Sequence, residues 1–241
     1  MIILYQFPGM WGLPNASPFC VKLETYLRMA EIPYEIRFVM NPKKSPKGKL
    51  PFIKMDGEPY ADTELIINHL QEKFGYPLDR HLNHEQRALN LLLEATFCER
   101  LYWIMLYFRW LDESEWAHVK QAFFAKIPAF SKWFLPCMVR KNMIKSLKSQ
   151  GIGRHTPQEV QEMGYRSLDA VAAILADKKY FHGDELTTID ATAFGFLSNI
   201  LWLPFEDPLK KHVQQHQNLL HYCDKIWTNF YPEMPKPFNL F

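Results

Sequence analysis

The sequence has few cysteines, and none of them lie close together. The four, Cys20, Cys98, Cys137 and Cys223, are spread over 241 residues without a C-x-x-C pair. In a chain of this size, four widely separated cysteines argue against both a disulfide framework and a structural zinc site. Reduced thiols are typical of the cytoplasm, so we expect a cytoplasmic protein whose thiols stay free.

Long apolar runs and a strong charge of one sign are also lacking. The longest apolar stretch, 191–205, contains Thr192, Ser198 and Asn199 and is shorter than the roughly 20 residues of a membrane span. The opening MIILYQFPG has no basic segment ahead of its apolar residues, so we expect no signal peptide. A net charge of +2 does not predict binding to nucleic acid or to an anionic membrane.

The composition is that of a folded protein with a large core. Hydrophobic residues make up 48% of the chain, aromatic residues 15% and charged residues 22%. These fractions exclude a disordered chain, and the length predicts one large domain or two small ones.

The first 76 residues alternate between strand and helix patterns. Apolar and β-branched residues favour strands, and apolar residues at helical spacing favour helices. The order is β-α-β followed by β-β-α, which predicts a parallel strand pair and an antiparallel hairpin. The expected strands are 2–7, 34–40, 50–56 and 58–61, and the expected helices are 18–31 and 63–74.

The remainder of the chain shows helical patterns only. Pro128 and Pro136 should break or kink the second helix, and capping boxes open the helices that follow Thr156 and Thr187. We therefore predict a small α/β domain at 1–76, a linker at 77–83 and an all-helical domain at 84–241. The expected helices are 84–110, 115–149, 157–177, 188–203 and 208–230.

Ser17 and Cys20 lie where a loop turns into the first helix, in the stretch NASPFC. A helix N-terminus stabilises an anion, and a serine hydroxyl there can donate a hydrogen bond to a thiolate. The simpler alternatives are that Ser17 only caps the helix and that Cys20 only packs in the core. The spacing matches a C-x-x-C motif with serine in first place, which excludes dithiol redox chemistry.

Two later segments add features that suit a peptide ligand. Pro51 opens a strand, where a cis bond would turn the backbone groups of the preceding Leu50 outward. Asp62 and Thr63 begin the next helix, where the helix amides and the Thr63 hydroxyl suit a carboxylate and Asp62 suits an amine. Taken alone, Asp62 and Thr63 would be interpreted as helix caps.

Together these motifs resemble the glutathione transferase family. The segments SPFC, GKLPFI, ADTELIINHL and LTTIDATAFGFL resemble its active-site serine, its cis-proline segment, its γ-glutamyl-binding element and its C-terminal capping-box helix. The stretches KNMIKSLKSQG and QGIGRH resemble the branch of the failed-axon-connections and metaxin-like proteins. The resemblance covers essentially the whole chain and implies a thioredoxin-like domain followed by an all-helical domain.

The resemblance implies a role for each matching residue. Ser17 would activate the glutathione thiol, Leu50 would pair with its cysteinyl unit and Pro51 would supply the cis bond. Asp62 and Thr63 would hold the γ-glutamyl end, and Lys49 or Lys47 would meet the glycyl carboxylate. Glutathione would be a co-substrate, the second substrate a hydrophobic small molecule, the role detoxification, and the assembly a homodimer. No metal, nucleic acid or integral membrane segment is implied.

The sequence departs from the family pattern at several points. Asp62-Thr63 replaces the usual Glu-Ser, and the loop 8–16 is long and carries Trp11. Tyr5 lies on the first strand, where other members place a catalytic tyrosine, so it is a reserve candidate. Three hypotheses therefore remain: conjugation through Ser17, thiol transfer through Cys20, and a binding or scaffolding protein that is not an enzyme.

Other residues have simpler interpretations. The pattern places His212, His216 and His221 on one helix without a matching carboxylate, which favours a solvent-facing helix over a metal site. Arg140 and three following lysines form a basic stripe that we expect to face solvent. Most aromatic residues of the first helices after the linker should be core, and some should wall the pocket for the second substrate. The aromatic residues concerned are Trp103, Tyr107, Phe108, Trp110, Trp116, Phe123, Phe124, Phe130, Trp133 and Phe134.

Overall fold

A four-stranded mixed sheet forms the N-terminal part of the protein. The computed structural model describes residues 1–125, 127–204 and 206–236. The strand order is β2-β1-β3-β4, with β1 parallel to β2 and antiparallel to β3, and β3 antiparallel to β4. This confirms the predicted parallel pair and hairpin. The strands are β1 (Ile2–Gln6), β2 (Tyr34–Phe38), β3 (Phe52–Met55) and β4 (Glu58–Ala61).

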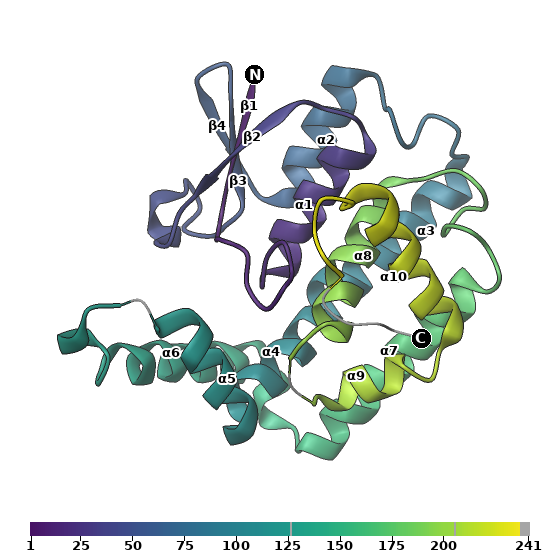
Figure 1. Ribbon diagram of the computed structural model, residues 1–241. Coiled ribbons are helices and arrows are strands. Elements are labelled where there is room, and N and C mark those ends of the chain that lie inside the picture. Colours follow the sequence, from purple (N-terminus) through teal and green to yellow (C-terminus); the bar gives the residue numbers. More distant parts are fainter. Residues whose placement is uncertain (126, 205, 237–241) are drawn as a thin grey trace.

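Two helices of this part, α1 (Pro18–Met29) and α2 (Thr63–Phe74), lie between the sheet and the helical part of the chain (Figure 1). Helix α1 is buried along almost its whole length, including the charged Lys22 and Glu24. Such burial on every side is expected of a helix that has the sheet on one face and another helix on the other. The thioredoxin-like order of elements is confirmed.

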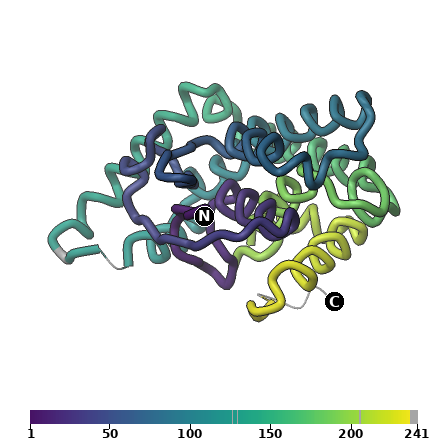
Figure 2. Tube along the Cα trace, turned by 90° about the horizontal axis from the view of Figure 1, so that it is seen from above, coloured from purple at the N-terminus to yellow at the C-terminus, as the bar shows by residue number. Residues whose placement is uncertain are grey.

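The rest of the chain is helical, as predicted. Its π-helical turn, Thr96–Leu101, joins α3 to α4 without a break. Helices α5 and α6 extend away from the C-terminal helices in both views (Figures 1 and 2). The helices are α3 (His84–Ala95), α4 (Tyr102–Leu111), α5 (Glu113–Phe124), α6 (Leu135–Gln150), α7 (Pro157–Leu175), α8 (Thr188–Leu201), α9 (Pro208–Val213) and α10 (Gln217–Phe230).

Two predicted helices differ from the structure. The segment 115–149 is interrupted near Pro128, as expected, but Pro136 lies in the first turn of α6, where its missing N–H costs nothing. The segment 208–230 was predicted as one helix and is two. The backbone N–H of His216 bonds to the carbonyl of Val213, a tighter turn than an α-helix, and His216 is extended at φ −99°.

Helix α8 is the centre of the helical core. All of its residues from Ile189 to Leu201 are buried, and the Thr187 capping box that opens it is present as predicted. The Asp190 carboxylate accepts hydrogen bonds from the Thr187 N–H at 2.8 Å and from the Phe181 N–H at 3.1 Å. Among the described residues, none of the helices combines the length and apolar character needed to cross a membrane.

Candidate functional site

The three predicted ligand-binding segments meet at one end of the sheet. Phe52 pairs with Ala61 across β3 and β4, so the residues just before Phe52 and those just after Ala61 emerge side by side. Cys20 of α1 packs with Leu50 and Phe52 in one small core cluster. The start of α1, the Leu50-Pro51 segment and the start of α2 therefore converge, and the Leu50–Pro51 bond is cis, as predicted.

Ser17 is the N-cap residue of α1 and is half-buried. Its backbone is extended, at φ −95° and ψ 119°, and Pro18 takes the first helical position. Within the described part of the chain, the Ser17 hydroxyl caps no backbone N–H of α1. The simple capping interpretation of this serine therefore lacks its hydrogen bond, and the hydroxyl lies at the positive end of the helix dipole.

The loop that precedes Ser17 is fixed by a set of polar contacts that the sequence analysis did not identify. Asn15 donates from its side chain to the Phe7 carbonyl at 2.5 Å and accepts from the Ser17 N–H at 3.1 Å. Arg109 of α4 donates to the Ala16 carbonyl at 3.0 Å. These contacts hold the loop and the first turn of α1 in one conformation.

Arg109 links this loop to α8 as well. Its guanidinium donates to the Asn199 carbonyl at 2.6 Å, and the Asn199 side chain donates to the Asn15 carbonyl at 3.3 Å. Arg109 is only 5% exposed, and burial lowers the pKa of its guanidinium. The sequence does contain a signal for the buried role of Arg109, because Arg109 is the single charge in the apolar run IMLYFRWL. A lone charge in such a helix implies a buried polar partner.

Two acidic side chains, Asp207 and Glu115, lie close enough to Arg109 for their charges to interact with it. Asp207 is buried and caps α9, and Glu115 of α5 is 3% exposed. Burial, reinforced by the charges of Asp207 and Asp112, raises the pKa of Glu115 to about 8. The loop before Ser17 is therefore supported by a buried arginine whose nearby carboxyl, Glu115, takes up a proton near neutral pH.

Cys20 has the character of a core residue. It is fully buried, and burial raises the pKa of its thiol to about 12 against the smaller effects of hydrogen bonds with the Ser17 side chain and the Phe7 backbone. A nucleophilic cysteine needs a lowered pKa and access to solvent. Both observations weigh against Cys20 as the residue that forms a mixed disulfide.

Asp62 and Thr63 stand at the N-terminus of α2 as predicted. The Asp62 carboxylate accepts from the Glu64 N–H at 3.1 Å and from the Leu65 N–H at 3.4 Å, so it caps the helix. Its backbone has φ 86° and ψ 122°, a conformation that is costly for a residue other than glycine and that is often found at binding sites. Asp62 is exposed, and Thr63 is buried against the fold. Lys47 and Lys49, near the cis bond, are exposed.

Tyr5 and Trp11 are both held by other rings. The Tyr5 ring stacks on Phe52, with 4.4 Å between ring centroids and 5° between planes. Trp11 and Gly12 form a tight turn with φ 60° and 77°, and the Trp11 ring meets Phe123 edge-on at 5.9 Å. Tyr5 thus packs in the sheet domain, and the long loop reaches toward α5 of the helical domain.

The aromatic residues of α4 to α6 divide into two groups. Those from Trp103 to Phe124 are buried or half-buried, as predicted for core. Most of the set is therefore core, as expected, whereas Phe130, Trp133 and Phe134 are 74%, 79% and 40% exposed. They lie beyond α5, on the part of the chain that extends away from the core.

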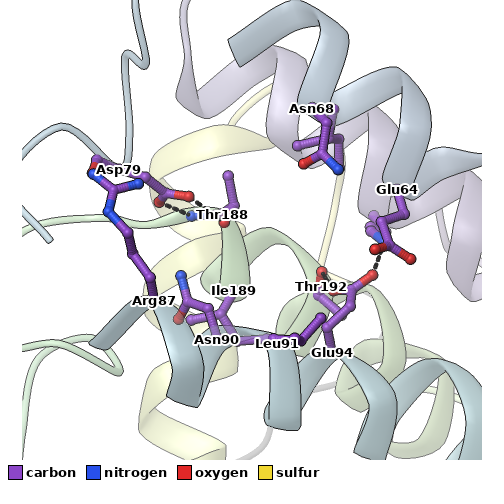
Figure 3. A pocket seen from close by; sticks show the side chains of 12 residues that line it. Glu64, Asn68, Asp79, Arg87, Asn90, Leu91, Glu94, Thr188, Ile189 and Thr192 are labelled. Carbon is purple, nitrogen blue, oxygen red and sulfur yellow. Dashed lines mark hydrogen bonds and ion pairs between the residues drawn. The ribbon is translucent and has the colours of Figure 1, made fainter. Parts of the chain in front are cut away.

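A separate cleft of about 220 Å³ lies between α2, α3 and α8 (Figure 3). Its floor holds the buried ion pair between Lys22 and Glu94, and Thr192 donates to Glu94 at 2.6 Å. Although burial opposes ionisation, the Lys22 charge and hydrogen bonds keep the pKa of Glu94 below its ordinary range. None of the predicted ligand-binding residues lines this cleft, which we assign to the packing of the two domains.

Comparisons with known proteins match the whole architecture. Family models for the glutathione S-transferase N-terminal and C-terminal domains match residues 18–115 and 164–226. The solved glutathione transferase F7 from Populus trichocarpa superposes with a TM-score of 0.63 at 17% identity, covering 98% of this chain and 100% of that one.

Three relatives are similar over nearly the full chain. Failed axon connections of Drosophila melanogaster is 33% identical over 97% of this chain, which spans 59% of that protein. An isoprene-epoxide–glutathione S-transferase of Rhodococcus sp. (strain AD45) is 30% identical, covering 94% of this chain and 98% of the relative. Metaxin-1 of Macaca fascicularis is 27% identical, covering 97% and 78%.

Proposed function

Since the chain belongs to the glutathione S-transferase family, in the branch with Failed axon connections and metaxin-1, we propose that it binds glutathione where α1, the Leu50-Pro51 segment and α2 converge. Ser17 stabilises the glutathione thiolate, which attacks a hydrophobic electrophile. The meeting of these segments, through the pairing of Phe52 with Ala61 and the packing of Cys20 on Leu50, is the observation that carries the proposal.

The chemistry follows from the position of Ser17. A thiolate at the N-terminus of α1 is stabilised by the helix dipole and by a hydrogen bond from the hydroxyl. Both effects lower the thiol pKa and raise the fraction present as the nucleophile. The sulfur then forms a bond to an electrophilic carbon, the bond to the leaving atom breaks, and the thiol proton passes to solvent.

The remaining residues place the peptide. The Leu50 backbone pairs with the cysteinyl unit, Asp62 meets the amine of the γ-glutamyl end and the amides of α2 with Thr63 meet its carboxylate. Lys49 meets the glycyl carboxylate. The aromatic residues of α4 and α5 wall the site of the hydrophobic substrate, and Trp11 of the preceding loop contacts Arg109 of α4 and Phe123 of α5. A homodimer and a reducing cytoplasmic location, suited to four free cysteines, belong to the same proposal, as does a role in detoxification.

A second function is favoured by a different observation. The exposed aromatic side chains Phe130, Trp133 and Phe134 lie near one another in sequence beyond α5. Exposed apolar patches mark interaction surfaces in soluble proteins. The same fold would then serve as a binding or scaffolding protein, with glutathione bound without turnover or not bound at all.

Calorimetric titration with glutathione tests the binding step and the role of Ser17, on which the enzyme depends. We expect binding to the wild type and to Ser17→Ala, with the ultraviolet absorbance of the thiolate lost only in Ser17→Ala. Ser146→Ala, an exposed serine of α6, is the matched control and should behave as the wild type. A thiolate signal retained in Ser17→Ala would refute the role of Ser17, and absence of binding by the wild type would refute the enzyme and favour the scaffold.

A further inference from the structure

Three potential metal ligands from two parts of the helical domain meet on the surface. The Nε2 atom of His212 lies 2.6 Å from Oδ1 of Asp169, and the Nε2 atom of His216 lies 2.9 Å from the same oxygen. The ligand atoms of all three side chains lie within 4.8 Å of one another. Asp169 comes from α7, whereas the two histidines flank the turn between α9 and α10.

This arrangement corrects the sequence interpretation of the histidines. A single helix over 208–230 offered no carboxylate at helical spacing, and that lack favoured a solvent-facing helix. The chain instead turns between His212 and His216, and α9 packs against α7, which supplies Asp169. The missing ligand is separated from the histidines by more than 40 residues in sequence and is brought to them only by the tertiary fold.

The ring of His212 is held in place by its neighbours. It stacks on the ring of Tyr165, with 3.9 Å between centroids and 8° between planes. The centroid of the His216 ring lies 5.2 Å from that of His212, with 74° between the two ring planes. Tyr165 precedes Asp169 by one turn of α7, so the same helix orients the first histidine and supplies the carboxylate. Ordered ligands of this kind reduce the entropy lost when an ion binds.

We propose that Asp169, His212 and His216 bind a divalent transition-metal ion of the zinc class. Two imidazole nitrogens and one carboxylate oxygen suit zinc, nickel or cobalt, whereas calcium and magnesium prefer oxygen ligands alone. Three protein ligands leave a position for water, and the side chains are 14%, 25% and 52% exposed for His212, His216 and Asp169, which gives an ion access.

To hold the ion, the two nitrogen–oxygen separations must open, and the two imidazole nitrogens, now within 4.8 Å of each other, must stand at the spacing of tetrahedral ligands. Ligand atoms around tetrahedral zinc lie about 3.3 Å apart, given bonds of roughly 2.0 to 2.1 Å. The two nitrogen–oxygen separations must therefore open by several tenths of an ångström. Asp169 is the most exposed of the three side chains, at 52%, and so has the most room to move.

The bound ion would fasten α7 to the turn between α9 and α10. These elements lie at the opposite end of the helical domain from the α5–α6 extension (Figure 1). None of the three ligands belongs to the candidate glutathione site, so the proposal is independent of the proposed function. Its main consequence is stabilisation of the helical domain, because a ligand that binds only the folded state raises the unfolding temperature.

The test uses the full chain without an affinity tag, stripped of metal by a chelator. Titration with zinc chloride should show one site, and the unfolding temperature should rise by several degrees at saturating zinc. Cobalt chloride should give a visible absorption band without the ultraviolet band of a cobalt–thiolate bond. His216→Ala and Asp169→Asn should each weaken zinc binding at least tenfold, with unchanged circular dichroism.

His84→Ala is the matched control, because His84 is an exposed histidine at the start of α3 and lies outside the cluster. It should bind zinc as the wild type does. Equal affinity in the wild type, His216→Ala and Asp169→Asn would overturn the proposal. A cobalt–thiolate band that disappears in Cys137→Ser would also overturn it, since the exposed Cys137 would then be the ligand.

Discussion

Gly195 of α8 lies directly against the backbone of Lys22 in α1. A Cβ atom placed on Gly195 would lie 2.8 Å from the Lys22 backbone nitrogen and 2.7 Å from the carbonyl oxygen of Pro18. Backbone atoms cannot move aside as a flexible side chain can. The absence of a side chain at Gly195 therefore sets how closely the two domains approach, and it fixes the first turn of α1, next to Ser17.

We expect Gly195→Ala to destabilise the protein by about 2 to 4 kcal/mol, because the new methyl group overpacks a helix contact made of backbone. Urea unfolding measures the change. The intrinsic helix preference acts in the opposite direction, since alanine favours a helix over glycine by about 1 kcal/mol. A variant as stable as the wild type would show that the two domains do not pack this closely.

Breaking the largely buried ion pair between Lys22 and Glu94 should cost far more stability than breaking an exposed one. Lys22→Met leaves a buried carboxylate without its cation, which typically costs about 3 to 5 kcal/mol. Lys73 and Asp56 form an exposed pair at 2.7 Å and provide the control, because Lys73→Met should cost less than about 1 kcal/mol. Thermal or urea unfolding of the two variants compares them directly.

The same pair carries a pH dependence of defined sign. The pKa of Glu94 is lowered in the folded state, so its stabilising contribution is complete above the ordinary pKa of a glutamate and is lost as the pH falls below it. Lys22→Met should flatten the loss of stability in acid. If Lys22→Met and the wild type had identical acid unfolding profiles, Lys22 would not be the cause of the lowered pKa of Glu94.

The titration of Glu115 should change stability with pH in the direction opposite to that of Glu94. Its pKa rises from the ordinary glutamate range to about 8 on folding, so the folded state holds a proton that the unfolded state releases. Its contribution to the free energy of unfolding therefore falls as the pH rises from about 4.5 to 8, by at most about 1.4 kcal/mol per pH unit for one proton.

Glu115→Gln removes this titration, and we expect the variant to gain stability relative to the wild type between pH 6 and 8. Unfolding temperatures measured across that range give the difference between the two proteins. Glu113→Gln, at the exposed start of the same helix, should keep the slope of the wild type. Parallel curves for the wild type and Glu115→Gln would show that Glu115 is ionised in the folded protein.

The sequence predicted the sheet, most of the helices and the placement of the three candidate segments on strand and helix ends, because each is encoded locally. The cis bond before Pro51 and the capping box of Asp190 arise from neighbouring residues, and their patterns are visible in a short stretch. The domain boundary remains a prediction, as do the role of Ser17 and the other contacts with glutathione, which depend on a ligand.

What the sequence did not predict depends on contacts between distant residues. Arg109 reaches Ala16 and Asn199, and Asp169 reaches His212, through separations of 43 residues or more. Periodicity in one helix contains no information about such partners. The break between α9 and α10 was missed for a related reason, since its apolar pattern continues across the turn and neither proline nor glycine marks it.

Arg109 should control the proposed reaction through the position of Ser17. Arg109→Lys keeps the charge but cannot reach both the Ala16 and the Asn199 carbonyls, because a lysine lacks the forked guanidinium. We expect kcat/KM for conjugation to fall about tenfold, which is about 1.4 kcal/mol, with its acidic limb shifted to higher pH because the thiolate is less well stabilised. Arg100→Lys, at an exposed arginine that bonds to Ser167 on α7, should leave the profile unchanged. If Arg109→Lys lowered stability but left the pH profile in place, Arg109 would support the fold alone and would not position Ser17.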